Sequence, residues 1–238
     1  MRACFLLLLL PAVKSVAQQP ADTFLVKNAQ KLVQPYERKY IQYTETKDGH
    51  ILFNAILTRK TQQINNQWLI TQTYQTAKSI DTDSSYCDMQ TLMPVAYATN
   101  IESGAYRERV SFAKPSIHNR IIYNDSSTEA SYINSNRYNG VIETDLIATL
   151  PLEDNRSFVL KAVNPGLHYT EYLITITVEG KEDITITGIG KIACWRLRVN
   201  EGGSSSSTEW YSVNGKQQIK KVFVFKNGNS FIRTLLAG

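Results

Sequence analysis

The chain has 238 residues and a formal net charge of +5, from 26 basic and 21 acidic residues. No run of Lys or Arg exceeds two residues, whereas electrostatic binding of nucleic acid needs a concentrated basic face. We therefore expect no nucleic-acid partner. All-β chains of this length commonly fold as one domain and bury about 70% of their unfolded surface, so neither a disulfide nor a metal is needed for folding.

The beginning of the chain has the features of an export signal. An unbroken apolar run, Phe5–Leu10, follows a short positive start, and Ser15 and Ala17 are the small residues that signal peptidase prefers. The run is far shorter than the roughly 20 residues of a membrane span. We predict a signal peptide over 1–17 and a single exported domain over 18–238. It would lie in the periplasm or at the outer membrane, without a transmembrane span.

A helix and then several strands are predicted after the signal. Asp22 can cap a helix that runs to Gln34, and its apolar positions are Leu25, Ala29, Leu32 and Val33. Other segments alternate at period two and are rich in β-branched residues, which is typical of half-buried strands. These segments are Arg38–Thr46, Ile51–Arg59, Gln67–Ala77, Arg107–Phe112, Asn119–Tyr123 and Ile219–Phe225.

The C-terminal half contains a second predicted helix, Thr144–Leu150, which a proline ends. Tyr172–Val178 and Ile184–Thr187 alternate as two strands, and Gly180 is expected to turn the chain between them. The Gly- and Ser-rich stretch Gly202–Ser207 predicts a flexible loop tip between strands.

Pairs of residues that accept positive φ angles separate several of these strands. They are Asp48-Gly49, Asn214-Gly215 and Asn227-Gly228, and such pairs favour tight hairpin turns. Strands joined by close turns form a meander, and a long meander must curl to protect its edges. The sequence therefore predicts a mainly β fold: a strongly curved antiparallel meander sheet, open or an incomplete barrel, with one or two short covering helices.

The segment of residues 192–199 alternates between two faces. Ala193, Trp195, Leu197 and Val199 share one face, which we expect to lie in the core. Cys194 shares the other, wetter face with two arginines.

Three interpretations of Cys194 stay open. It could pair with Cys87 in a disulfide, since the exported chain would hold two cysteines. Both could instead be structural free thiols, or Cys194 could be a catalytic thiol beside basic residues. A catalytic thiol also needs a base and an orienting group, and the three histidines are scattered along the sequence.

Other catalytic and metal-binding motifs are absent from the sequence. There is no Gly-x-Ser-x-Gly, His-Glu-x-x-His or Cys-x-x-Cys motif. Asp81–Ser85 begins like a calcium loop, but Tyr86 occupies the position that needs glycine, so a solvated turn is the expectation. We predict no catalytic activity, no metal and no cofactor.

The order of three stretches resembles the domain of unknown function 3108 family, exported proteins of Gram-negative bacteria, in its Bacteroidetes form. Leu150–Asp154 precedes a strand at Ser157–Ala162, a Cys-Trp-x-Leu-x-Val strand follows at Cys194–Val199, and a Trp-Tyr-Ser strand lies at Trp210–Ser212. The resemblance covers roughly residues 36–236. The family often has glycine where this chain has Asp154 and Asn155.

The resemblance implies a fold but no established activity. Such chains are similar in outline to the carriers and receptors that handle lipoproteins in the bacterial envelope. Those proteins have a curved, unclosed antiparallel sheet with helices on its concave side. The sequence reading of strands and helices agrees with this outline.

An enclosed apolar space on the concave side would be the default ligand site. The candidate lining residues are Tyr40, Phe53, Trp68, Tyr172 and Trp195, which are otherwise ordinary core residues. We expect a protein that binds or carries a lipid or other apolar ligand there. The alternative is a non-catalytic structural or partner-docking envelope protein whose sheet is filled by its own side chains.

Overall fold

The structure, a computed structural model, describes residues 22–102, 104, 106–124, 126–164, 169–202 and 205–237. The predicted export signal lies outside these residues. The strands are β1 (Asp22–Thr23), β2 (Tyr36–Glu45), β3 (Ile51–Ile64), β4 (Gln67–Gln75), β5 (Ile80–Asp88), β6 (Pro94–Ile101), β7 (Tyr106–Phe112), β8 (Ser116–Tyr123), β9 (Ser126–Ile133), β10 (Tyr138–Asn139), β11 (Ser157–Asn164), β12 (Thr170–Ile186), β13 (Gly190–Glu201), β14 (Ser205–Ser212), β15 (Gln218–Val224) and β16 (Ser230–Leu235). The helices are α1 (Ala29–Leu32) and α2 (Glu143–Thr149), and a short 3-10 helix, η1 (Gly140–Ile142), leads into α2.

The described strands form one sheet of sixteen strands. Its order is β1-β11-β12-β13-β14-β15-β16-β2-β3-β4-β5-β6-β7-β8-β9, and β10 also pairs with β11. Only β1 and β10 run parallel to their neighbour. In the described part of the chain no ladder joins β9 to the other end of the sheet, so the sheet is not closed into a barrel. The predicted curved antiparallel meander is confirmed.

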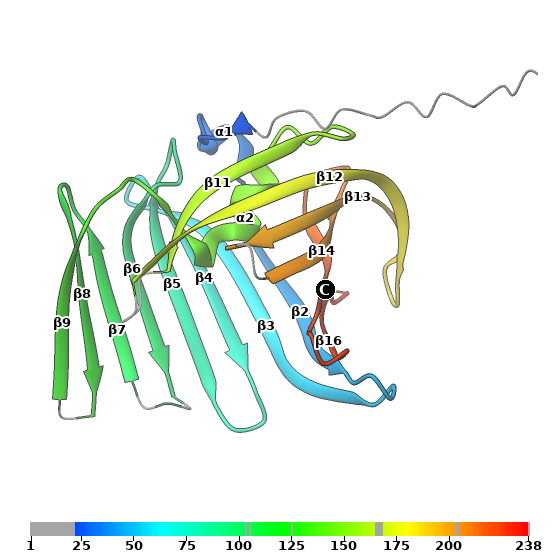
Figure 1. The fold of residues 1–238 in the computed structure, drawn as a ribbon, viewed down its shortest axis with the longest axis horizontal. Helices are drawn as coiled ribbons and strands as arrows, with labels where there is room; N and C mark the ends of the chain where they lie inside the picture. Colours follow the sequence, from blue (N-terminus) through cyan, green and yellow to red (C-terminus); the bar gives the residue numbers. More distant parts are fainter. Residues whose placement is uncertain are drawn as a thin grey trace, which may run out of the picture.

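The chain forms two meanders that meet in the middle of the sheet. One runs from β2 to β9 and the other from β11 to β16, and the ladder between β16 and β2 joins them. Figure 1 shows the sheet curving from β9 to the long β12–β13 hairpin, with α2 inside the curve. None of the described helices has the length and apolar character that crossing a membrane requires.

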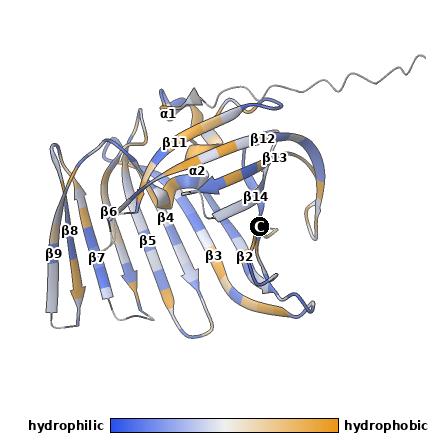
Figure 2. Cartoon of the chain, viewed as in Figure 1, coloured by the Kyte–Doolittle hydropathy of each residue, from blue (hydrophilic) through white to orange (hydrophobic). Residues whose placement is uncertain are grey.

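The largest hydrophobic cluster, called the main cluster here, packs α2 against the sheet. Leu146 and Ile147 of α2 are fully buried in it, against Ile70 of β4, Phe158 of β11 and Leu197 of β13. Figure 2 shows hydrophobic residues along β11 and β12, the strands above α2. Burial of this apolar surface is the dominant favourable contribution to folding.

The N-terminal helix prediction is wrong in most of its length. Asp22 lies in β1, which pairs with β11, and the amide of Phe24 continues this pairing by donating to the Val159 carbonyl. Asn28 then has φ of 58°, a left-handed conformation that an α-helix does not tolerate, so α1 begins only after it. The second predicted helix is confirmed to within one residue at each end.

Gly180 does not turn the chain. β12 continues through it as one strand of 17 residues, and Gly180 sits in a β-bulge opposite Arg196 with φ of 136°. Glycine is tolerated at such a bulge because it has no Cβ. By contrast, Gly49, Gly215 and Gly228 have positive φ values in turns between strands, as predicted.

Two further turn or loop predictions are wrong in part. Asp81–Ser85 is not a turn but lies in β5, where cross-strand pairing with β4 and β6 overrides its polar composition. Ser205–Ser207 of the predicted loop tip belongs to β14, and Ser207 is buried.

The two faces of β13 are both used for packing. Trp195, Leu197 and Val199 face the main cluster as predicted, whereas Ala193 is exposed and Cys194 is fully buried, against the prediction. Cys194 belongs to a second cluster with Tyr40, Leu57, Ile186, Ile219 and Leu235. The physical reason is that an apolar cluster packs on each face of β13, the main cluster around Trp195 and the second cluster around Cys194.

Cys87 and Cys194 are free thiols in separate clusters. Of the three interpretations, the structure corresponds to two structural thiols. Burial raises the pKa of Cys194 to about 11 and that of Cys87 to about 12, so both stay protonated at neutral pH.

The difference between core and exposed aromatic residues is testable by substitution. Trp195→Ala should lower the free energy of unfolding by about 3–5 kcal/mol, because it leaves a cavity in the main cluster. Phe53→Ala is the control: its side chain is 52% exposed, so the loss should be under about 1 kcal/mol. Urea denaturation of both variants measures the two values, and the opposite ranking would contradict the fold.

Candidate functional site

A row of polar side chains crosses the concave face of the sheet. Residues paired across neighbouring strands point to the same face, and the register aligns Arg59, Gln72, Asp83, Thr99 and Glu108 from β3 to β7. We call these five residues the polar row. Inward polar side chains are costly unless they find partners, so the contacts of this row are informative.

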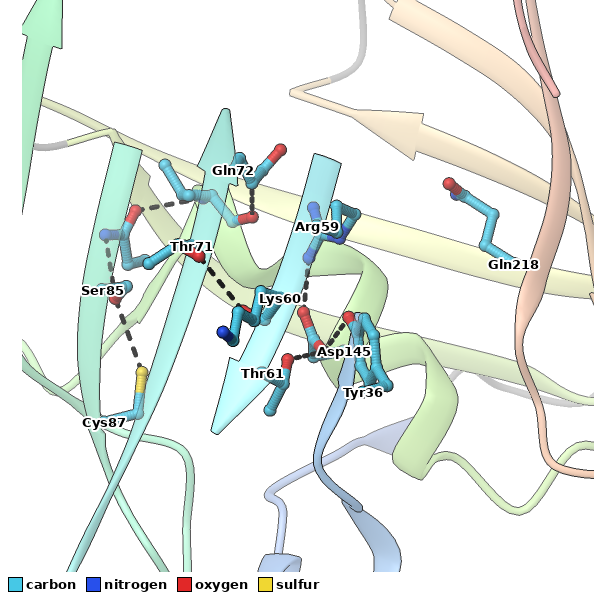
Figure 3. A network of polar contacts seen from close by, with 12 residues as sticks. Tyr36, Arg59, Lys60, Thr61, Thr71, Gln72, Ser85, Cys87, Asp145 and Gln218 are labelled. Atoms are coloured by element: carbon cyan, nitrogen blue, oxygen red, sulfur yellow. Dashed lines mark hydrogen bonds and ion pairs between the residues drawn. The ribbon is translucent and has the colours of Figure 1, made fainter. Parts of the chain in front are cut away.

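The first member of the polar row holds α2 against the sheet. Arg59 forms an ion pair with Asp145 of α2, and the two side chains are 1% and 3% exposed. Asp145 also accepts hydrogen bonds from the hydroxyls of Tyr36, at 2.7 Å, and Thr61, at 3.3 Å. Figure 3 shows these three side chains converging on Asp145. The carboxylate of the helix is therefore satisfied entirely from β2 and β3.

The turn before α2 is attached to the next strands. Gln72 donates to the carbonyl of Val141 in η1, and the Tyr74 hydroxyl donates to Gln72 Oε1 at 2.8 Å. Asn139 donates to Ser85 Oγ of β5 at 3.4 Å. Together with the ion pair, these contacts place η1 and α2 firmly in one half of the concave side.

A second charged group lies on the other side of α2. Lys221 of β15 contacts the carboxylates of Glu209 at 2.8 Å, Glu201 at 3.3 Å and Glu143 at 3.7 Å. Burial raises the pKa of Glu143 to about 8, Lys221 opposes this rise, and the negative charges of Glu209 and Glu201 add to it. Three carboxylates thus share one ammonium group, and burial favours the protonated form of Glu143.

A protein-family model matches the part of the chain that contains this site. The family described as "Protein of unknown function (DUF3108)" matches residues 41–231, from within β2 to within β16. The chain belongs to this family. Membership of this family, inferred from the three sequence stretches, is thereby confirmed. No curated protein matches the chain.

The aromatic residues predicted to line a ligand site do not gather in one place in this DUF3108 protein. Trp68 and Trp195 belong to the main cluster and Tyr40 to the second cluster. Phe53 is exposed. Tyr172 alone borders a hollow, an open depression of about 1070 Å³ between the start of β12 and the end of β13.

The residues that do converge on the concave side were missed in the sequence. Arg59 ends a predicted strand two residues after the apolar Leu57. In a strand, residues two apart point to the same face, so this spacing indicates that Arg59 points inward. Asp145 stands in the first turn of a predicted helix, where an acidic residue is common in any case. Asp83 was assigned to a turn, so its inward position in β5 was hidden.

The ion pair between Arg59 and Asp145 should be essential for stability. Arg59→Ala leaves Asp145 buried and uncompensated, and we expect a loss of about 3–5 kcal/mol in the free energy of unfolding. Lys60→Ala is a matched control from the next position. Its pair with Glu37 is 46% and 53% exposed and should contribute under about 1 kcal/mol. Equal losses in urea denaturation would contradict the assigned role.

The protonation of Glu143 should make stability depend on pH. Its folded pKa of about 8 lies above the unfolded value of 4.5, so between these values the folded state binds a proton that the unfolded state has released. The contribution of Glu143 to stability is therefore fully present below about pH 4.5 and is lost as pH rises through this window. In the Glu143→Gln variant, the free energy of unfolding, taken from denaturation curves at about pH 5, 7 and 9, should fall less as pH rises. The Glu153→Gln variant, in which the replaced side chain is exposed, should show the same fall as the wild type. If stability changes equally with pH in the wild type and both variants, Glu143 does not hold the buried proton.

Proposed function

We propose that this DUF3108 protein is exported to the cell envelope, in the periplasm or at the outer membrane, and binds a lipid or other apolar ligand on the concave side of its sheet. The observation that carries the proposal is the difference between the two halves of that side. Figure 1 shows α2 within the half that includes β3 and β4, whereas no helix lies in front of β7, β8 or β9 in this view.

The half without a helix has an apolar inner face. Tyr97, Val110 and Ile117 form a third cluster across β6, β7 and β8, and Val141 and Tyr169 pack on it from outside these strands. Such a surface, covered by partly buried side chains of β9, η1 and the segment before β12, is easier to open than one under a packed α-helix. The signal-like pattern at the beginning of the sequence supports export.

The alternative is a non-catalytic structural or partner-docking envelope protein. This alternative is supported by the half of the concave side that contains α2, because side chains of the protein itself fill that half. Trp68 and Trp195, expected as ligand contacts, belong to this filling. We propose no catalytic role for either function, since both thiols are buried and have raised pKa values.

The proposal is tested on the full chain expressed with its signal in a Gram-negative host. Intact mass should show cleavage near Gln18, and organic extraction of the purified protein should release a lipid or other apolar molecule. Val110→Asp, on the inner face of β7, should reduce the amount of bound apolar molecule per protein at least about tenfold. This corresponds to a loss of roughly 1.4 kcal/mol in binding free energy.

The matched control is Ile133→Asp on β9, where the native side chain is 83% exposed, and its occupancy should be unchanged. Circular dichroism verifies that both variants fold. A protein that carries no apolar molecule, and that takes up none when mixed with a fatty-acid probe, would favour the docking alternative.

A further inference from the structure

The polar row continues beyond α2 and contains two carboxylates, Asp83 and Glu108. They come from β5 and β7 and lie on either side of Thr99 of β6 in the register. Among the described residues neither carboxylate forms a salt bridge. Arg59, the nearest cation of the row, is engaged with Asp145. This part of the row therefore holds two carboxyl groups without a matching cation.

Glu108 is the less satisfied of the two carboxylates. Its residue is only 4% exposed, and its Oε1 atom is buried without a hydrogen-bond partner in the described part of the structure. Asp83 accepts a hydrogen bond from the Tyr97 hydroxyl at 2.9 Å. Burial raises the pKa of both carboxyl groups. A buried carboxylate oxygen with no donor is unfavourable, and a bound cationic group would relieve this cost.

Tyrosine rings border the two carboxylates. The next row on the same face runs through Tyr74, Asp81, Ile101, Tyr106 and Tyr123. The rings of Tyr106 and Tyr123 lie 5.6 Å apart between centroids. Asp81 adds a third carboxylate to this face. Tyr106 lies two residues before Glu108 on the same face of β7, and burial and then the charge of Glu108 raise the pKa of Tyr106.

The arrangement suits an organic cation better than a metal ion. In the described ranges no group of three or more His, Cys, Asp or Glu residues is placed to hold a metal. Asp83 and Glu108 stand two strand spacings apart, roughly 10 Å between backbones. A metal ion needs several ligand oxygens at about 2.3–2.6 Å. An ammonium group carried on carbon can instead donate to carboxylates and place its C–H groups on tyrosine faces.

We propose that strands β5 to β7 hold the ammonium group of an organic cation between Asp83 and Glu108, with Tyr97 and Tyr106 beside it. The inference rests on the proposed function, because it uses the same concave face and assigns the polar end of the ligand. The apolar end would lie along the third cluster, whose residues Tyr97 and Val110 lie two positions along their strands from Thr99 and Glu108, on the same face.

The test compares three probes that share an eight-carbon chain: octylammonium, octanol and octanoate. Isothermal titration at about pH 7.5 should show octylammonium binding the wild-type chain about tenfold more tightly than octanol, with octanoate weakest. Glu108→Gln should remove this preference while leaving octanol binding within about twofold. Glu129→Gln is the matched control, since that carboxylate is 70% exposed on β9, and it should retain the full preference.

The outcomes separate the inference from the proposed function. Wild-type protein that binds octanol as tightly as octylammonium overturns the cation site and leaves apolar binding intact. Absence of binding for all three probes overturns both. If circular dichroism shows that Glu108→Gln is unfolded, Asp83→Asn replaces it, and an unchanged preference in that variant also overturns the cation site.

Discussion

The buried ion pair between Arg59 and Asp145 is the contact on which the arrangement of the concave side depends. A single short helix could not hold its position by helix propensity alone, because an isolated helix of this length is unstable in water. The ion pair and the two hydroxyls around Asp145 fix the helix from β2 and β3. The leucine and isoleucine side chains of α2 then complete the main cluster. The ion pair and hydrogen bonds therefore determine the position of α2, whereas burial of apolar side chains contributes most of the stability.

The consequence is a sheet with two unlike halves. Where α2 sits, two members of the polar row contact the η1–α2 segment: Arg59 pairs with Asp145, and Gln72 donates to the carbonyl of Val141. Farther along the same row, Asp83 accepts a hydrogen bond from Tyr97, but neither Asp83 nor Glu108 forms a salt bridge among the described residues. The same cross-strand register therefore produces a structural anchor in one half and a candidate binding surface in the other. This contrast is the main reason to place ligand binding on β5–β9.

Local sequence patterns predicted most of the fold. Period-two alternation identified strands such as β3 and β4, and Asn-Gly or Asp-Gly pairs identified hairpins, because both signals depend on near neighbours. The failures came where tertiary contacts decide. Asp22 joins a strand because β11 offers it a partner, and Gly180 bulges because β13 continues opposite to it. The polar row was out of reach, since aligning Arg59 with Glu108 requires the register of four successive ladders.

The position of β16 has a consequence for how the chain acquires its structure. This strand lies in the middle of the sheet. Among the described residues, its pairing with β2 is the only ladder between the two meanders. Its partner β2 stands almost two hundred residues earlier, so this contact carries the largest loop-closure entropy of the sheet. Each meander can form from neighbouring strands, but the two can join only when β16 reaches β2. Until β16 meets β2, each meander therefore keeps an unpaired edge strand, and completion of the sheet waits for its most distant contact.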